Sequence, residues 1–386
     1  MSKLTKIKSD RIVLADKVVS GYVYLEDGKI KEVSTKDIPC DTEYDYTGCF
    51  VTPGFIEMHT HGAGGHAFIN STPEDILAGC DYHLEHGTTT ILPTVTSSPI
   101  DVMGVAVKDI VTAIKSGKSR ANILGAHMEG PYLSIAQCGA QCPDFITPPI
   151  KKDYAELLDE CGEYIKRWTY APENDANGEF CKYLTERGII ASAGHSDAKY
   201  PDIATAIDNG CNLITHLYSG TSTVTRKMGF RSLGVIESAF LRDELYVEII
   251  ADGRHLPVEL VQMIVKLKGR DKVALITDSL EIAGTDITEG VMGGTEFIVE
   301  DGVCKLKDRS AFAGSIATSD RIVRFMVNEA NFDITDAVYM LTAVPAKILG
   351  VNKGSLEANK DADLVVLSDE LTVKSVFVGG ELVVNN

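Results

Sequence analysis

Histidines and carboxylates stand at the ends of short apolar segments along this chain, and their types suit a divalent metal. His59 and His61 are separated by one residue, so on extended backbone both imidazoles point to the same side. Paired imidazoles on one face suit zinc or iron. Further residues of this kind, each at or just beyond the end of an apolar segment, are Glu129, His195, His216, His255 and Asp278. The chain has only nine histidines, so chance explains this arrangement poorly.

Taken one at a time, these residues have ordinary alternative interpretations. Two histidines in a strand can be solvated or packed in a core, and Glu129 could simply cap its loop. As a set, Glu129, His195 and His216 supply the three protein ligands of a catalytic metal and leave a position for water. Asp278 could be a helix cap or a loop residue, but opposite such a cluster it would act as a proton acceptor and donor. The ordered series favours a metal-dependent hydrolytic site.

The elements that would position these residues alternate between short apolar strands and amphipathic helices. The strand candidates are eight in number and cover residues 55–59, 88–93, 122–128, 166–171, 189–194, 212–215, 246–250 and 273–277. Helical patterns follow most of them, for example over residues 179–187, 201–208 and 257–268. Eight β/α units in succession predict an α/β fold, a (β/α)8 TIM-like barrel, with its active site at the C-terminal strand ends.

The two ends of the chain are rich in β-strand patterns and lack helices. Apolar runs at 22–25 and 29–33 flank Asp27-Gly28, a pattern typical of a tight hairpin turn. Near the C-terminus, runs at 364–367, 376–378 and 382–384 surround Gly379-Gly380 and predict a second hairpin. These ends could pair into one small sheet. An insertion over 284–311 follows the eighth strand, and Gly293-Gly294 and Asp301-Gly302 indicate that it also carries a hairpin.

The composition excludes several kinds of partner and location. Lysine and arginine number 37 and aspartate and glutamate 55, which gives a net charge of −18. Nucleic acids and anionic membranes favour a positive surface, so neither is expected as a partner. The nine cysteines show no disulfide-framework spacing and indicate reduced thiols. With no signal-peptide pattern at the start and no apolar run near ~18 residues, the sequence predicts a soluble cytoplasmic enzyme.

The ordered motifs together resemble the N-acetylglucosamine-6-phosphate deacetylase family of the metal-dependent amidohydrolase superfamily. The resemblance covers nearly the whole chain and continues to 354–356 and 362–365. The motifs that carry it are Pro53-Gly54-Phe55-Ile56-Glu57-Met58-His59-Thr60-His61, His127-Met128-Glu129-Gly130-Pro131, Ala193-Gly194-His195-Ser196, Thr215-His216-Leu217-Tyr218, Ala251-Asp252-Gly253-Arg254-His255, Thr277-Asp278 and Ala313-Gly314-Ser315.

The resemblance implies a domain division and a reaction. Residues 1–52 together with 354–386 would form a small β-sandwich, and residues 53–353 the catalytic barrel. The reaction would be removal of the N-acetyl group from an amino-sugar 6-phosphate. Glu129, His195 and His216 would bind one divalent ion, with Asp278 as the acid/base. Some members lack the first histidine pair and use one metal. Here His59 and His61 imply a second ion, and zinc is expected before iron, manganese or cobalt.

The resemblance also implies a set of substrate contacts and a homodimer. Arg231 would reach the substrate phosphate bound in the neighbouring subunit. The other implied contacts are Ala140, Gln141, Ser219, Gly220, His255, Phe312, Ala313 and Gly314.

The chain departs from the family pattern at three places in or next to these contacts. Gln141 replaces a histidine that helps polarise the substrate carbonyl, Ser219-Gly220 replaces Asn-Ala at a phosphate contact, and Gly229-Phe230 replaces histidines before Arg231. We expect all three departures to affect substrate recognition and none to affect the metal.

Two alternatives remain beside this hypothesis. A related amidohydrolase could act on N-acetylgalactosamine 6-phosphate, another N-acyl sugar, an N-acyl amino acid or a cyclic amide. Many cyclic amidohydrolases resemble one another in using a lysine at the fourth strand, where this chain has Ala171-Pro172-Glu173. The second alternative is a non-catalytic sugar-phosphate-binding protein, which would typically have lost ligands or the base; all are present here.

Overall fold

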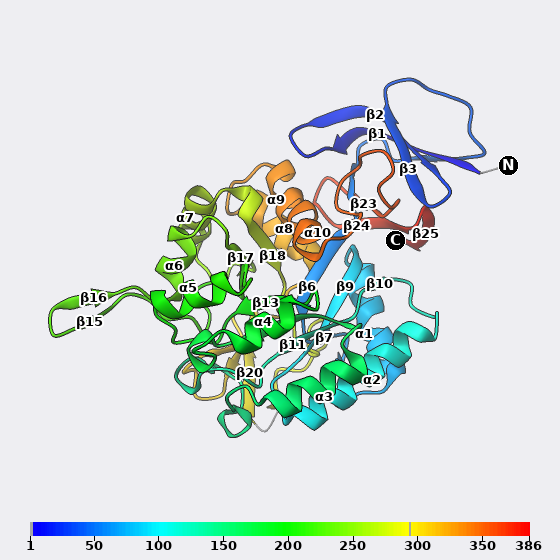
Figure 1. Cartoon of the computed structure of the whole chain (residues 1–386). Helices are drawn as coiled ribbons and strands as arrows, with labels where there is room; N and C mark the ends of the chain where they lie inside the picture. Colours follow the sequence, from blue (N-terminus) through cyan, green and yellow to red (C-terminus); the bar gives the residue numbers. More distant parts are fainter. Residues whose placement is uncertain (1–2, 293–294) are drawn as a thin grey trace.

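The structure is a computed structural model that describes residues 3–292 and 295–386. Within these residues, eight strand positions form a parallel barrel, and each of the eight predicted strands is confirmed (Figure 1). The barrel closes between its last and first strands, where the Asp278 N–H donates to the His59 carbonyl over 2.9 Å. In barrel order the strands are β6 (Phe55–Thr60), β9 (Thr88–Val95), β10 (Asn122–Ile123) with β11 (Ala126–Glu129), β12 (Ile165–Tyr170), β13 (Ile190–Ala193), β14 (Leu213–Ile214), β17 (Tyr246–Ile250) and β18 (Val273–Ile276).

Helices surround the barrel, and the main hydrophobic core lies between them and the strands. The helices predicted over 179–187, 201–208 and 257–268 are confirmed as α4, α5 and α7. No helix among the described residues is both long and apolar enough to span a membrane. The bounds are α1 (Pro73–Glu85), α2 (Ile100–Lys115), α3 (Lys151–Cys161), α4 (Glu179–Thr185), α5 (Tyr200–Asp208), α6 (Val235–Leu241), α7 (Val258–Lys268), α8 (Ser319–Asn328), α9 (Ile334–Leu341) and α10 (Ala343–Leu349).

Helix α1 shows how the local sequence defines an element. Thr72 and Asp75 form a reciprocal capping box at its start, and Pro73 occupies the first turn, where its missing N–H costs nothing. The buried face of the helix packs against β9 and consists of Ile76, Gly79, Cys80, His83 and Leu84. Because these positions recur at helical spacing, one side of α1 covers the barrel while the other faces solvent.

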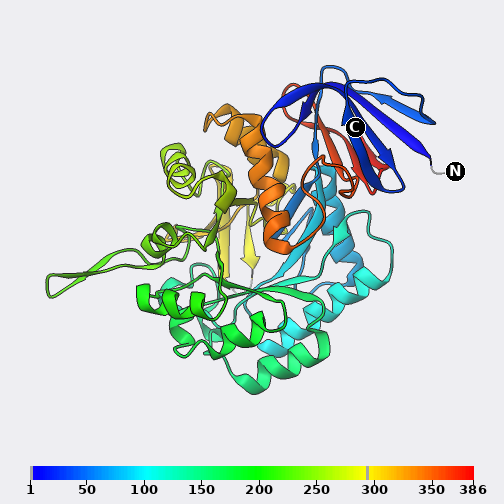
Figure 2. The same cartoon turned by 45° about the horizontal axis from the view of Figure 1, so that its top comes forward.

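Both chain ends join in one small sheet, as predicted (Figure 2). The two expected hairpins are confirmed, with Glu26 opposite Lys29 and Val378 opposite Glu381. Side chains from both ends of the sheet, including Val23, Ile30 and Phe377, enclose its own core. The sheet order is β25 (Glu381–Asn385), β24 (Val373–Val378), β23 (Leu364–Leu367), β5 (Phe50–Pro53), β1 (Leu4–Val13), β2 (Val18–Glu26) and β3 (Lys29–Ser34), with β4 (Thr42–Asp45) also paired to β1.

The small sheet leads directly into the first barrel strand. Only Gly54 separates β5 from β6, and its N–H donates to the Asp363 carbonyl over 2.8 Å. A Cβ atom at Gly54 would lie 2.1 Å from the Thr89 hydroxyl oxygen, so a larger residue would push β6 and β9 apart. The small sheet therefore lies beside the N-terminal end of β6, and His59 stands near the opposite end of that strand.

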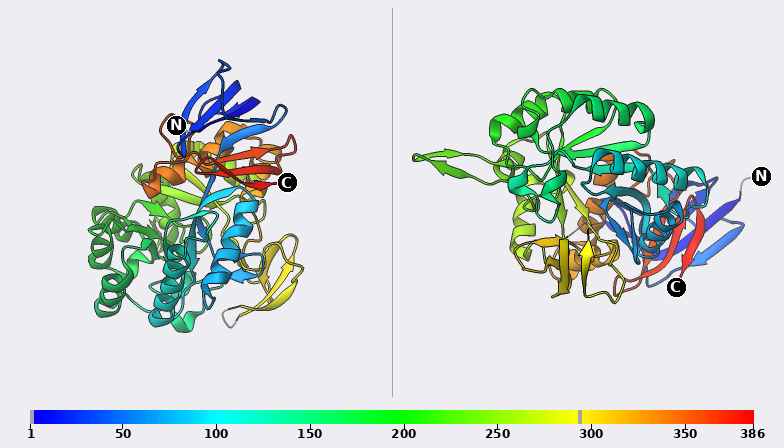
Figure 3. Two further views of the ribbon diagram at one scale, coloured as in Figure 1. Left: turned by 90° about the vertical axis from the view of Figure 1, so that its right-hand side faces the viewer. Right: turned by 90° about the horizontal axis from the view of Figure 1, so that it is seen from below.

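Two excursions leave the barrel (Figure 3). The insertion after β18 is larger than the predicted hairpin: it is an antiparallel sheet of β19 (Glu289–Met292), β20 (Thr295–Glu300), β21 (Val303–Leu306) and β22 (Phe312–Gly314). The predicted turn at Asp301-Gly302 lies between β20 and β21, whereas Gly293-Gly294 falls outside the described residues. The second excursion is a projecting hairpin of β15 (Thr225–Lys227) and β16 (Phe230–Ser232).

Candidate active site

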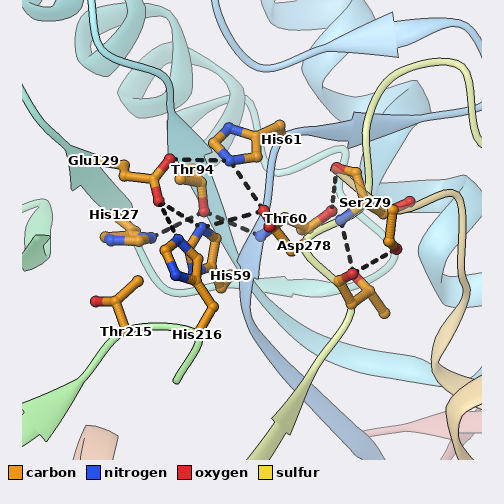
Figure 4. A network of polar contacts seen from close by, with 12 residues as sticks. His59, Thr60, His61, Thr94, His127, Glu129, Thr215, His216, Asp278 and Ser279 are labelled. Atoms are coloured by element: carbon orange, nitrogen blue, oxygen red, sulfur yellow. Dashed lines mark hydrogen bonds and ion pairs between the residues drawn. The ribbon is translucent and has the colours of Figure 1, made fainter. Parts of the chain in front are cut away.

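Most of the predicted histidines and carboxylates meet at the C-terminal ends of the barrel strands. Figure 4 shows His59, His61, His216, Glu129 and Asp278 pointing toward one another. His59 lies on β6 and His61 just after it, Glu129 ends β11, and Asp278 follows β18. His195 and His216 follow β13 and β14. Within the part of the chain that the structure describes, three groups have potential ligand atoms within 4.8 Å of one another. They are His59 with His216 and Asp278, His59 with His61 and Glu129, and Glu129 with His195 and His216.

The Glu129 carboxylate is the centre of the cluster. Its Oε1 atom lies 3.0 Å from His216 Nε2 and 3.3 Å from the Nε2 atoms of both His59 and His195. Its Oε2 atom lies 3.3 Å from His61 Nε2. Asp278 faces the same space, with Oδ1 at 3.4 Å from His59 Nε2 and 3.2 Å from His61 Nε2. Four imidazole Nε2 atoms therefore converge on two carboxylates.

The other ring nitrogen of each histidine is held by a neighbour. His195 Nδ1 donates to the Gln137 carbonyl over 2.9 Å, and His216 Nδ1 donates to the Ser219 carbonyl over 3.0 Å. His61 Nδ1 hydrogen-bonds the Thr96 hydroxyl at 2.7 Å. Because a carbonyl can only accept, His195 and His216 keep the Nε2 lone pair directed into the site.

The backbone that presents three of these residues is unusual. His195, His216 and Asp278 have φ values of 44°, 25° and 49°, in the region that non-glycine residues rarely adopt. Such conformations persist where the surroundings impose them, and they cluster at functional sites. Gly220, with φ 53°, completes this packing: a Cβ atom there would lie 2.8 Å from His195 Nδ1.

The charges of the cluster stabilise one another although every member is buried. Burial opposes ionisation of Asp278, but the facing His59 and His61 lower the pKa of Asp278 to about 2. Burial likewise lowers the pKa values of the histidines, yet Asp278 and Glu129 raise the pKa of His59 to about 10 and that of His61 to about 9. The two carboxylates thus create a strongly cation-attracting space.

These observations test whether the residues suit a divalent metal, and they do. The donor set combines imidazole nitrogens with carboxylate oxygens, as zinc and related ions prefer. Among the described residues, the buried His59 Nε2 atom has no hydrogen-bond partner, as expected for an atom that serves a ligand outside the protein. The cluster is therefore suited to a divalent cation.

The predicted substrate residues lie in different places around this cluster. His255 and Phe312 contact each other with ring centroids 4.9 Å apart, and Ala313 and Gly314 lead to Ser315, whose N–H donates to the Asp278 carbonyl. Ala140 precedes Gln141 in the loop after β11. Arg231 lies apart from the cluster, on exposed strand β16.

Two of the three departures from the family pattern lie beside candidate metal ligands, and the expectation that they leave metal binding unchanged stays a prediction. The Gln141 amide donates to Glu129 Oε2 over 2.7 Å. Ser219 supplies the carbonyl that holds His216, and Gly220 packs against His195. These positions therefore shape the candidate ligands themselves, because their loops fold back over the strand ends.

Three charged residues of the site were missed from the sequence. Glu57 accepts the backbone N–H groups of His59 and Thr277, each over 2.9 Å, and burial raises its pKa to about 7. Arg167 and Glu248 form an ion pair inside the barrel, beneath the histidines. Glu57 and Glu248 could have been noticed as single charged residues within apolar stretches of their strands, whereas Arg167 directly follows Lys166 and stands out less.

Comparison with known proteins agrees with this geometry. The amidohydrolase family matches residues 50–383. N-acetylglucosamine-6-phosphate deacetylase of Bacillus subtilis (strain 168) is 33% identical, with 99% of this chain and 98% of the relative covered. N-acetylgalactosamine-6-phosphate deacetylase of Shewanella sp. (strain ANA-3) is 32% identical, with 88% and 84% covered.

A solved structure has the same architecture. N-acetyl-D-glucosamine-6-phosphate deacetylase of Mycobacterium smegmatis, determined as a mutant in complex with N-acetyl-D-glucosamine-6-phosphate, superposes with a TM-score of 0.91. It is 26% identical, and the match covers 99% of this chain and all of that one. The chain belongs to the amidohydrolase family and, within it, to the N-acetylglucosamine-6-phosphate deacetylase family.

Proposed function

We propose that this protein hydrolyses the N-acetyl group of an amino-sugar 6-phosphate, with N-acetylglucosamine 6-phosphate as the expected substrate. The products would be acetate and glucosamine 6-phosphate. The observation that carries the proposal is the convergence of four imidazole Nε2 atoms on Glu129, with Asp278 facing the same buried space. The deacetylases among its relatives support this substrate class.

The cluster offers places for one or two divalent ions. Glu129, His195 and His216 would hold the first, and His59 and His61 would hold the second together with the same Glu129 carboxylate. Zinc suits this nitrogen and oxygen donor set, and iron, manganese and cobalt are alternatives. When bound, such an ion polarises the acetyl carbonyl and lowers the pKa of the attacking water.

Asp278 would move the proton in this reaction. Its low pKa keeps the carboxylate ionised at neutral pH, ready to take a proton from the attacking water. The water oxygen bonds to the acetyl carbon, the C–N bond breaks, and Asp278 returns the proton to the leaving amine. Two backbone hydrogen bonds, to His59 and from Ser315, hold the Asp278 main chain at this place.

The sugar would lie between Asp278 and the pair formed by His255 and Phe312. Asp252 holds His255 Nδ1 at 2.9 Å, which leaves Nε2 for a sugar hydroxyl. The partly exposed Phe312 ring offers an apolar face to the pyranose. Ala313 and Gly314 continue this wall toward Asp278, and the loop with Ala140 and Gln141 would face the acetyl group.

The proposed function is tested by measuring acetate release from purified protein. We expect release from N-acetylglucosamine 6-phosphate, its loss after chelation, and its return when Zn²⁺, Mn²⁺, Fe²⁺ or Co²⁺ is added. Binding of the phosphosugar without acetate release under every metal would indicate a non-catalytic sugar-phosphate-binding protein. Preferential hydrolysis of an N-acyl amino acid or a cyclic amide would indicate another amidohydrolase.

N-acetylgalactosamine 6-phosphate is the second substrate to compare in the same assay. The N-acetylgalactosamine-6-phosphate deacetylase of Shewanella sp. is 32% identical, nearly as similar as the glucosamine enzyme of Bacillus subtilis at 33%. Higher kcat/KM for the galactosamine epimer would assign that substrate instead, with the same site chemistry.

We further propose that the projecting hairpin acts in a homodimer and brings Arg231 to the phosphate in the neighbouring subunit. Arg226 lies directly opposite Arg231, so two guanidinium groups share one face of the hairpin. Met228 and Phe230 are 91% and 79% exposed, which is typical of a surface covered by a partner. Since the chain has a net charge of −18, phosphate binding depends on such local cations.

Arg231→Met is expected to raise KM for the 6-phosphate substrate about 10- to 100-fold with little change in kcat. The reason is the loss of a charge-assisted hydrogen bond worth ~1.5–3 kcal/mol. Steady-state kinetics with and without the phosphate measure the effect, and sedimentation reports the dimer. Lys227→Met is the matched control, because Lys227 lies opposite Phe230 on the other face of the hairpin. A parent enzyme that ignores the 6-phosphate would contradict the role of Arg231.

A further inference from the structure

We infer that Arg167 and Glu248, an ion pair buried inside the barrel, position His59 and His216 and thereby set how tightly the site holds its metal. The inference rests on the proposed metal-dependent function and deepens it. Arg167 comes from β12 and Glu248 from β17, and both side chains are completely buried.

Arg167 holds the Glu248 carboxylate with both arms of its guanidinium. One arm pairs with Oε1, and the other donates to Oε2 over 2.8 Å. The same arginine donates to the Thr215 hydroxyl at 2.8 Å and to the Ser192 hydroxyl at 3.2 Å, and it reaches the Met58 carbonyl at 3.3 Å. Its side chain thus connects five barrel strands, and a two-armed contact of this kind leaves the carboxylate little freedom.

Glu248, held in place by Arg167, hydrogen-bonds two candidate ligands. Its Oε2 atom accepts from His59 Nδ1 over 3.4 Å and from the backbone N–H of His216 over 3.3 Å. The first contact turns His59 Nε2 toward Glu129 and Asp278. The second holds the main chain of His216, whose φ of 25° needs support from its surroundings. One carboxylate oxygen therefore orients a residue from each proposed metal position.

A contribution to the stability of the fold does not by itself explain why this ion pair is present. A buried ion pair is often no more stabilising than apolar side chains of the same volume, because both charges lose their hydration. A carboxylate that holds the Nδ1–H of a metal-binding histidine has a known effect instead: it fixes the ring and makes the Nε2 atom a better ligand. The position of Glu248 behind His59 fits the second explanation.

The test replaces both charges at once, so that no uncompensated ion is left in the barrel. Arg167→Met with Glu248→Leu is expected to fold but to bind Zn²⁺ about 10- to 100-fold more weakly in competition with a chromophoric chelator. We also expect an altered visible spectrum of the Co²⁺-loaded protein, because His59 and His216 lose their orientation. Circular dichroism and thermal unfolding report the fold.

Asp363→Asn is the matched control. Asp363 is also a buried carboxylate, paired with Lys353 at 2.6 Å, but it lies at the junction with the small sheet. The Asp363→Asn substitution should lower thermal stability and leave Zn²⁺ affinity and the Co²⁺ spectrum unchanged. If this double variant does not fold, Arg167→Gln with Glu248→Gln, which also removes both charges but keeps a polar amide at each position, is compared in its place.

The outcomes separate this inference from the proposed function. A parent protein that binds no Zn²⁺ and releases no acetate overturns the proposed function itself. A parent that does both, beside a folded variant with the same Zn²⁺ affinity and the same Co²⁺ spectrum, overturns only the positioning role of Arg167 and Glu248. The positioning role is supported if the double variant binds Zn²⁺ more weakly and has a changed Co²⁺ spectrum while Asp363→Asn shows neither change.

Discussion

Asp278→Asn is expected to lower kcat for acetate release by about 10²–10⁴-fold, the range contributed by a positioned acid/base. The substitution preserves the size of the side chain but removes its capacity to take a proton from water and return it to the amine. The 3.2 Å contact with His61 Nε2 directs the Asp278 carboxylate at the cluster, and the facing His59 and His61 lower its pKa. Metal content, measured by elemental analysis, should stay at the parent level.

The metal measurement distinguishes two roles for Asp278. Its carboxylate also lies within reach of His59 and His216, in a group that could itself hold a cation. If metal content falls together with the rate, the lower rate reflects the loss of Asp278 as a metal ligand and not its loss as a base. Asp363→Asn serves as the control for loss of a buried carboxylate elsewhere. A near-normal rate in Asp278→Asn would refute the proton-transfer role.

The barrel and the cluster could be predicted from the sequence because their signals are local. Each strand is a contiguous apolar run, and each candidate ligand stands at the end of such a run, where a barrel gathers its functional residues. His195 and His216 could be selected from their places at strand ends together with the ordered series to which they belong. The insertion after β18 was underestimated because β19 alternates between exposed and partly buried residues and leaves little apolar pattern to read.

The supporting residues could not be assigned because their partners are distant in sequence. Arg167 and Glu248 are 81 residues apart, and Glu57 and Thr277 are 220 apart. A charged residue in an apolar strand indicates only that some partner exists, since an unpaired buried charge is too costly. The position of Gln141 was similarly hidden: only the folded loop shows that its amide donates to Glu129.

Glu129→Gln is expected to remove most of the bound metal and to lower acetate release by about 10³-fold or more. Loss of the metal removes several kcal/mol of transition-state stabilisation, and each ~1.4 kcal/mol corresponds to tenfold in rate. The amide cannot replace the carboxylate in either orientation. If the NH2 group takes the place of Glu129 Oε2, it faces the Gln141 amide, which donates at that position, so two donors oppose each other. Turned the other way, the NH2 group would donate to the Nε2 lone pairs of His195 and His216 and would so occupy the atoms that the metal needs.

Glu129→Asp separates charge from position in this prediction. The aspartate keeps the negative charge but withdraws it by one methylene group, away from the four Nε2 atoms that now lie 3.0–3.3 Å from the two oxygens. We expect it to retain part of the metal, and therefore more activity than Glu129→Gln, with elemental analysis and acetate release falling in parallel. Full metal content and parent rates in Glu129→Gln would show that the histidines and Asp278 suffice, and that Glu129 only organises them.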